Sequence, residues 1–205
     1  KVLDAVEGKP EASLVSTVIL RSMARARYQP QNLGHFGLAA ETYTHFTSPI
    51  RRYPDLMVHR VVIRALVEGE PVPESWGGDA LMRASDRATM REDLATEAER
   101  DSVALKKAEF MERHLGDEFT GTVSGVTTFG FFVLLDEYFV EGLVHVNSLD
   151  DDFYNLREEE YALVGERRGR RFRLGDALRV QVARVNRLER KIDFVLIEDG
   201  ASKEV

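Results

Sequence analysis

The spacing of apolar residues changes at Asp117, and this change divides the chain into two kinds of structure. Residues 79–115 contain no proline or glycine and carry apolar residues at helical spacing, which predicts one long helix or two in series, ended by Gly116. After Asp117 the period falls to about 2, as in strands whose alternate side chains face a core. We therefore expect a mostly helical domain over residues 1–116, followed by a β-domain.

The β-domain should contain five short strands with a long connection, residues 150–173, after the third. This arrangement suits a small closed antiparallel barrel of the OB type, so the fold class is α+β. The barrel domain would cover residues 117–198 and leave residues 199–205 as a tail. The predicted strands are residues 119–126, 129–135, 140–146, 178–185 and 191–197.

Two shorter helices precede the long one. Residues 11–28 place apolar side chains on one helical stripe and turn Arg21 and Arg25 away from it. These two arginines share a face and could reach a phosphate chain, or form an ordinary solvated surface. Residues 54–68 form the second helix, which Gly69 ends.

An unusual concentration of prolines, aromatics, histidines and arginines lies in Tyr43–Arg60. Pro49 disfavours helical geometry just before it, and Pro54 suits the first turn of a new helix. Arg51 and Arg52 are therefore expected in a bend at a positive helix N-terminus, where an anion is stabilised. The alternative for Arg52 is an internal pair with Asp55 or Glu41.

Charge and composition exclude some classes of function but do not decide whether the protein binds RNA. The net charge is -7, yet residues 21–64 carry seven arginines against two acids, and residues 166–191 carry ten basic residues against three acids. Such segregated charge permits RNA binding without requiring it. The chain has no cysteine, which excludes disulfides and thiolate sites and agrees with a cytoplasmic setting. No apolar run approaches the roughly 20 residues of a membrane span, so we expect a soluble protein.

The motif around Arg51 resembles the RNB domain of the ribonuclease II and ribonuclease R exoribonucleases. The resemblance is specific because many fixed spacings agree, and it covers nearly all of residues 1–116 as the C-terminal portion of such a domain. The residues that carry it are Gly34–Leu38, Ser48–Tyr53, Asp55, His59 and Arg60.

This resemblance implies roles for individual residues. Arg51 would be catalytic, countering charge at the scissile phosphate. Either Glu97 or Glu99 would reach the ribose at the 3′ end of the RNA, and the sequence does not choose between them. We expect further RNA contacts from Arg21, Tyr43, Arg52 and Arg60.

Residues 117–198 resemble the S1 RNA-binding domain, through Phe129-Gly130, Phe132-Val133, Gly142–His145 and Leu174–Asp176. The resemblance implies that Phe129, Phe132 and His145 lie together on the outer face, where bases stack on flat rings. Phe131 should face the opposite side, and Phe119 and Phe194 should belong to the core. An arginine cluster at residues 167–173 would guide RNA electrostatically, with Arg170 and Arg171 among the contacts.

The RNB family holds its Mg²⁺ or Mn²⁺ with clustered aspartates from the earlier half of the domain, and nothing in residues 1–116 matches that cluster. The one aspartate run, Asp150–Asp152, is expected in a solvated loop. The chain is therefore interpreted as the C-terminal part of a processive 3′→5′ exoribonuclease that degrades single-stranded RNA to nucleoside 5′-monophosphates. It would be inactive without the missing N-terminal part, whether that part belongs to the same or a separate polypeptide. The alternatives are a non-catalytic RNA-binding module and a regulatory fragment.

Overall fold

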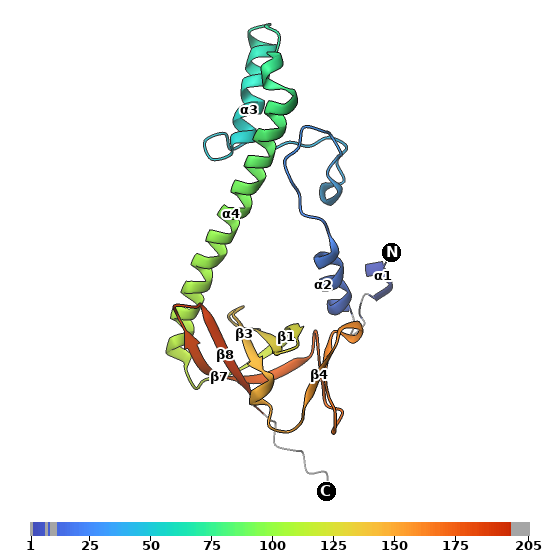
Figure 1. The fold of residues 1–205 in the computed structure, drawn as a ribbon, viewed down its shortest axis with the longest axis vertical. Helices are drawn as coiled ribbons and strands as arrows, with labels where there is room; N and C mark the ends of the chain where they lie inside the picture. Colours follow the sequence, from blue (N-terminus) through green and yellow to red (C-terminus); the bar gives the residue numbers. More distant parts are fainter. Residues whose placement is uncertain (1, 7, 9–11, 198–205) are drawn as a thin grey trace. The chain divides into compact units, whose positions relative to one another are not determined.

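The computed structural model describes residues 2–6, 8 and 12–197. The chain forms two compact units. Figure 1 shows their helices and strands and labels the main ones. The barrel unit consists of Lys1–Met23 and Asp101–Val205, and the helical unit of Ala24–Arg100. This division by spatial contact differs from the predicted domains 1–116 and 117–198, because residues before 24 and residues 101–116 are grouped with the barrel. The predicted tail, 199–205, lies outside the described residues.

The barrel unit contains the predicted five-stranded barrel, closed in the order β1-β2-β3-β8-β7. The expectation of a wholly antiparallel barrel is wrong, since β3 and β8 pair in parallel. A ring with an odd number of strands cannot alternate direction at every neighbour, so closing five strands requires a parallel pair. The strands are β1 Glu118–Thr127, β2 Gly130–Leu135, β3 Glu141–His145, β7 Ala177–Asn186 and β8 Lys191–Leu196.

The barrel core is built from alternate residues of these strands. Phe131 and Phe194 are buried, as predicted, and Phe119 packs partly buried against the same core. Gly142 is required on β3, because a Cβ there would lie 2.5–2.8 Å from three carbons of the Phe194 ring. A register shift between Val123 and Gly125 marks a bulge in β1.

The connection between β3 and β7 is not the simple loop that the sequence suggested. It folds into a three-stranded sheet in the order β4-β5-β6. These strands, β4 Tyr154–Arg157, β5 Ala162–Gly165 and β6 Arg171–Arg173, are only three or four residues long. Leu163 and Phe172 are fully buried in the barrel core, so the connection extends that core.

The helices follow the predicted order with shifted ends. The N-terminal helix stops at Ser22, six residues before the predicted end, and the long helix is a single one. The second helix continues through a π-helical turn, η2 Ile63–Val67, before Gly69 with φ +70°. The bounds are α1 Val2–Val6, α2 Ala12–Ser22, η1 Phe36–Leu38, α3 Tyr53–Val62, η3 Glu74–Trp76, α4 Gly78–Met111 and η4 Glu112–His114; η5 Val146–Ser148 and η6 Glu158–Glu160 lie in the barrel unit.

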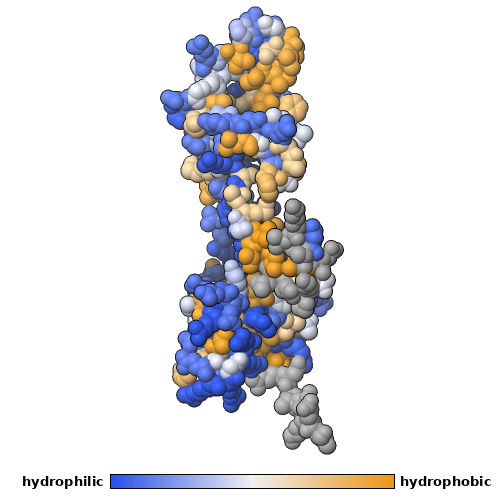
Figure 2. All heavy atoms as spheres, turned by 90° about the vertical axis from the view of Figure 1, so that its right-hand side faces the viewer, coloured by the Kyte–Doolittle hydropathy of each residue, from blue (hydrophilic) through white to orange (hydrophobic). Residues whose placement is uncertain are grey.

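The helical unit has no buried apolar side chain within residues 24–100, all of which are described. The two residues buried there are Asp55 and Ser85. Large apolar side chains are exposed instead, including Phe36, Ile50 and Leu66, and Figure 2 shows apolar surface among the polar side chains. None of the described helices is both long and apolar enough to cross a membrane.

Candidate functional site

The bend before α3 has the predicted geometry. The backbone N–H groups of Arg51 and Arg52 both point to the carbonyl oxygen of Ser48, at 3.3 and 3.0 Å. Arg52 is the N-cap of α3 in an extended conformation, and Pro54 lies in the first helical turn. Arg51 is exposed, and its side chain has no hydrogen bond or ion pair with any described residue. Its guanidinium is thus available beside a helix N-terminus, while its catalytic role remains a prediction.

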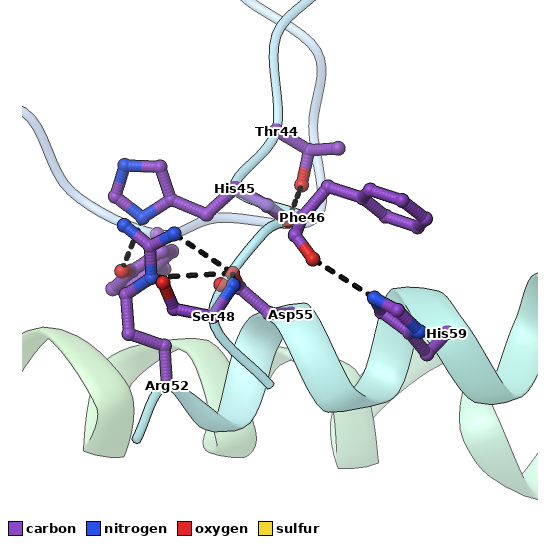
Figure 3. A network of polar contacts seen from close by, with 8 residues as sticks. Thr44, His45, Phe46, Ser48, Arg52, Asp55 and His59 are labelled. Carbon is purple, nitrogen blue, oxygen red and sulfur yellow. Dashed lines mark hydrogen bonds and ion pairs between the residues drawn. The ribbon is translucent and has the colours of Figure 1, made fainter. Parts of the chain in front are cut away.

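Asp55 binds both ends of this bend through one oxygen atom (Figure 3). Its Oδ2 accepts hydrogen bonds from the Ser48 backbone N–H at 2.8 Å and from Arg52 Nε and Nη2 at 3.2 and 2.8 Å. The Asp55 side chain is 0% exposed and that of Arg52 is 20% exposed. Arg52 therefore makes the internal pair that was its alternative role, and its contact with RNA remains a prediction.

The protonation of Asp55 reflects two opposing effects. Burial alone would raise the pKa of this carboxyl, but the hydrogen bonds from Ser48 and Arg52, with the Arg52 charge, hold the pKa below its usual value. The second oxygen, Oδ1, is buried and has no hydrogen-bond partner among the described residues. The site thus contains an ionised carboxylate of which only one oxygen is satisfied.

Histidine and aromatic rings extend from this bend. His59 on α3 contacts the Phe46 carbonyl oxygen through Nε2 at 2.8 Å and stacks on the Phe46 ring, with centroids 4.2 Å apart (Figure 3). His45 forms a 2.7 Å hydrogen bond between its Nδ1 and the Tyr28 hydroxyl. Burial, with Glu92 nearby, raises the pKa of Tyr28 to about 12, so the hydroxyl keeps its proton at neutral pH.

The sequence did not indicate that Tyr28 and His45 contact each other in this cluster of rings. They continue a row of edge-to-face rings in which Tyr43 lies between His35 and His45, with centroid distances of 5.0 and 5.7 Å. Tyr43 is half exposed at the middle of this row. The spacing Tyr43-x-His45 is compatible with such a row, but Tyr28 is too distant in sequence for spacing to reveal.

Three other predicted residues are not brought into this cluster by any contact. Arg60 is exposed near the end of α3, and Glu97 and Glu99 are exposed on α4. None of the three side chains has a hydrogen bond or ion pair with a described residue. The choice between Glu97 and Glu99 therefore remains open, and their roles remain predictions.

The aromatic patch of the barrel unit consists of Phe129, Phe132 and His145. The Phe129 ring centroid lies 6.3 Å from that of Phe132 and 6.4 Å from that of His145. Phe129 is 46% exposed, His145 is exposed and Phe132 is partly buried. Phe131 points the other way and stacks on Phe172 in the core, at 4.6 Å between centroids. The predicted grouping and orientation of these rings are thus present, and their contact with RNA remains a prediction.

Arg21 lies beside the aromatic patch. Its Nη2 donates a 2.7 Å hydrogen bond to the Ser124 carbonyl oxygen, in the β1 bulge. A Cβ at Gly125 would lie 3.6 Å from the Phe132 ring and 3.9 Å from Arg21 Nη2, so both side chains flank this glycine. A cation from α2 therefore lies beside the stacking surface.

The arginine cluster at residues 167–173 is partly neutralised. Arg170 contacts Asp151 at 3.3 Å and lies over the Phe172 ring, and Arg171 pairs with Glu160 at 3.0 Å. The Arg167 guanidinium lies over the exposed Phe153 ring, at 5.5 Å from its centroid. The two arginines predicted to bind RNA are thus ion-paired within the protein, and their contact with RNA remains a prediction.

The aspartate run Asp150–Asp152 organises this cluster instead of lying free in solvent. Asp152 accepts hydrogen bonds from the backbone N–H groups of Arg168 at 2.7 Å, Phe153 at 2.8 Å and Arg167 at 2.9 Å. These hydrogen bonds hold the pKa of Asp152 below its usual value, and the bond from Arg168 has the largest effect. Asp151 accepts from the Tyr154 hydroxyl. The expectation of a solvated loop is therefore wrong for Asp151 and Asp152, which are structural acceptors.

A divalent-metal centre does not fit the described part of the chain. Residues 2–6, 8 and 12–197 contain no group of three or more histidine, aspartate or glutamate side chains that could hold a metal ion. The carboxylates of Asp152 and Asp55 already accept backbone or guanidinium donors. No chemical step through a metal follows from these residues.

Comparison with known proteins shows which domain families the chain matches. Residues 1–68 match the family model of the RNB domain, and residues 113–196 match that of the S1 RNA binding domain. The chain therefore contains a segment that matches the RNB domain, followed by a segment that matches the S1 domain.

Curated relatives of the chain include ribonucleases R of several bacteria. The chain is 46% identical over 198 residues to ribonuclease R of Aquifex aeolicus, covering 97% of this chain and 28% of that protein. It is 44% identical over 205 residues to ribonuclease R of Escherichia coli K12, covering 96% of this chain and 25% of that protein. The chain thus spans about a quarter of the length of these curated relatives.

A solved structure supports the same assignment. RNase R of Mycoplasma genitalium, in complex with ribose-methylated single-stranded RNA, matches with a TM-score of 0.85 and 27% identity. The match covers 95% of this chain and 31% of that one.

Proposed function

We propose that this chain is part of a processive 3′→5′ exoribonuclease of the cytoplasm that hydrolyses single-stranded RNA to nucleoside 5′-monophosphates. The observation that carries the proposal is the exposed Arg51 guanidinium, held in a proline-bounded bend at the N-terminus of α3 and left without an internal partner among the described residues. The RNB resemblance supports this proposal, because it implies that an arginine of this motif would contact the scissile phosphate.

Electrostatics favour Arg51 over its neighbour for this role. The charge of Arg52 is compensated by Asp55, whereas that of Arg51 is not compensated by any described residue. A phosphoryl group gains negative charge on its oxygens as water attacks, and a fixed cation stabilises that transition state. The partial positive charge of the α3 N-terminus adds to the same effect.

The aromatic patch and Arg21 would hold the incoming strand. Phe129 and His145 offer accessible ring faces on which bases can stack, and such a stack is worth about 1–3 kcal/mol per base. Arg21 lies beside Phe132. Only its Nη2 bonds to Ser124, so its other N–H groups can donate hydrogen bonds to a phosphate. This combination of stacking rings and a cation is typical of single-strand binding without sequence preference.

The rest of the enzyme would complete the helical unit. A unit with no buried apolar side chain and exposed Phe36, Ile50 and Leu66 is expected to bury this surface against more protein. We propose that the remaining part of the RNB domain is that partner, and that it also carries the aspartates for Mg²⁺ or Mn²⁺. The chain alone would then bind RNA without hydrolysing it.

The test is hydrolysis of single-stranded oligoribonucleotides by the complete enzyme that carries this segment. A 3′-labelled RNA should release labelled nucleoside 5′-monophosphate at once, while a 5′-labelled RNA should shorten to a small end product without a ladder of intermediates. Arg51→Ala should slow turnover about 10²–10³-fold, the usual effect of losing one transition-state donor, and leave RNA affinity nearly unchanged.

Arg91→Ala is the matched control, since it removes another exposed arginine, which lies on α4 outside the predicted site. RNA binding without hydrolysis by the complete enzyme would replace the proposal with the non-catalytic RNA-binding module. A normal turnover rate for Arg51→Ala would refute the role of this arginine.

A further inference from the structure

We propose that Asp55 is a positioning residue for the reaction: it fixes the bend that presents Arg51 and acts on hydrolysis only through that arginine. The inference rests on the proposed function of Arg51. The Asp55 carboxylate is buried and lies four residues after Arg51 in the sequence. It contacts Ser48, before Arg51, and Arg52, after it, but not Arg51 itself.

The hydrogen bonds of the bend converge on two atoms. Asp55 Oδ2 receives the Ser48 backbone N–H from one end of the bend and the Arg52 guanidinium from the other. The Ser48 carbonyl oxygen receives the N–H groups of Arg51 and Arg52. Ser48, Arg52 and Asp55 are thus tied together, and the backbone of Arg51 between them has little freedom to turn.

Stability alone is a poor reason for this arrangement. A buried ion pair often contributes no more to folding than well-packed apolar residues of the same volume would. Asp55 is fully buried in a unit without buried apolar side chains, and its Oδ1 lacks a partner among the described residues. Such a locally costly choice is expected where geometry serves function.

The pairing also keeps the two neighbouring arginines distinct. The Asp55 carboxylate holds the Arg52 guanidinium within the protein, 2.8 Å away, while the adjacent Arg51 remains exposed. With the carboxylate charge removed, Arg52 is free to compete for the phosphate from a different position. Asp55 would therefore fix both the direction of Arg51 and its status as the free cation of the bend.

Asp55→Asn is the appropriate variant. The amide has the same shape, and its oxygen can occupy the Oδ2 position and accept from Ser48 and Arg52, which favours folding. It lacks the negative charge, so the bonds to Arg52 weaken. Asp55→Glu keeps the charge and adds a methylene that a fully buried site must accommodate, and it serves in the same comparison should the Asn variant not fold.

The experiment is a double-mutant cycle in the complete enzyme, with Arg51→Ala and Asp55→Asn alone and together. Single-turnover hydrolysis is measured at saturating RNA, alongside RNA affinity and thermal unfolding. We expect Asp55→Asn to slow hydrolysis about tenfold in the wild-type background and less than about twofold in the Arg51→Ala background, since residues that act through one group are not additive. RNA affinity should change less than about twofold, because the S1 barrel supplies most of the grip.

The outcomes are distinguishable. If the wild-type enzyme does not hydrolyse RNA, or if Arg51→Ala leaves the rate unchanged, the proposed function or the role of Arg51 fails, and this inference with it. If both of those hold but Asp55→Asn slows hydrolysis by the same factor in both backgrounds, or not at all, the positioning role alone is overturned.

Discussion

Phe129→Ala should weaken RNA binding with little effect on folding. The Phe129 ring is 46% exposed, and its neighbours in the patch lie 6.3 and 6.4 Å away by centroid, near the outer limit for aromatic pairs. Its loss therefore removes at most about 0.5–1.5 kcal/mol of ring pairing from the folded state. A base stacked on the free face is worth about 1–3 kcal/mol, which corresponds to a roughly 5- to 150-fold increase in Kd.

The assay is fluorescence anisotropy with a labelled oligoribonucleotide, performed with the complete enzyme in the Arg51→Ala background so that hydrolysis is slow during the measurement. Phe139→Ala is the control, because Phe139 is also an exposed phenylalanine of the barrel unit but lies outside both the aromatic patch and the arginine cluster. The control should change Kd less than about twofold, which is well below the increase expected from the loss of one stacked base. Equal weakening by both variants, or none by Phe129→Ala, would refute the assignment of the patch.

Three further predictions concern other parts of the chain. Gly142→Ala should destabilise the barrel by about 1–3 kcal/mol, because the added methyl group overlaps the buried Phe194 ring; thermal unfolding measures this, and an unchanged Tm would contradict it. Arg21→Gln should lower the slope of log K against log salt for RNA binding by about one, whereas an unchanged slope would show that Arg21 contacts no phosphate. Because the folded-state pKa of Asp55 is lowered, its carboxylate stabilises the fold above the unfolded pKa of about 3.9, and this contribution is lost as the pH falls through the lower folded value. The difference in unfolding free energy between wild type and Asp55→Asn should therefore shrink on acidification over that range, and a constant difference in urea titrations would argue against it.

Local patterns in the sequence were sufficient to locate the barrel strands and the Arg51 bend. Alternation with period 2 put Phe131 and Phe132 on opposite faces, and Pro54 marked the start of α3, as the structure confirms. Both features depend on neighbours a few residues apart, which is the range over which periodicity and proline geometry act.

Features that depend on distant partners could not be predicted in the same way. Arg21 contacts Ser124, which is 103 residues away, and nothing in the spacing of α2 indicates this partner. Strands of three or four residues, such as β6, are too short for a period to be recognised. The acceptor role of Asp152 arises because the chain returns to it at Arg167 and Arg168, so a run of aspartates looked like solvated surface.

The two units hold their candidate functional groups by different physical means. The aromatic patch lies on a barrel whose core is apolar and whose strands are paired all round, so its geometry is fixed by packing. The Arg51 bend lies in a unit without buried apolar side chains, and its shape depends on the hydrogen bonds of Asp55 and Ser48. Hydrogen bonds and ion pairs strengthen as water is excluded, so covering the exposed apolar surface of this unit with further protein would make the same bonds hold Arg51 more firmly. Full catalytic geometry at Arg51 is therefore expected only in the complete enzyme, whereas the proposed stacking of RNA on Phe129 would require no more than the barrel that this chain already forms.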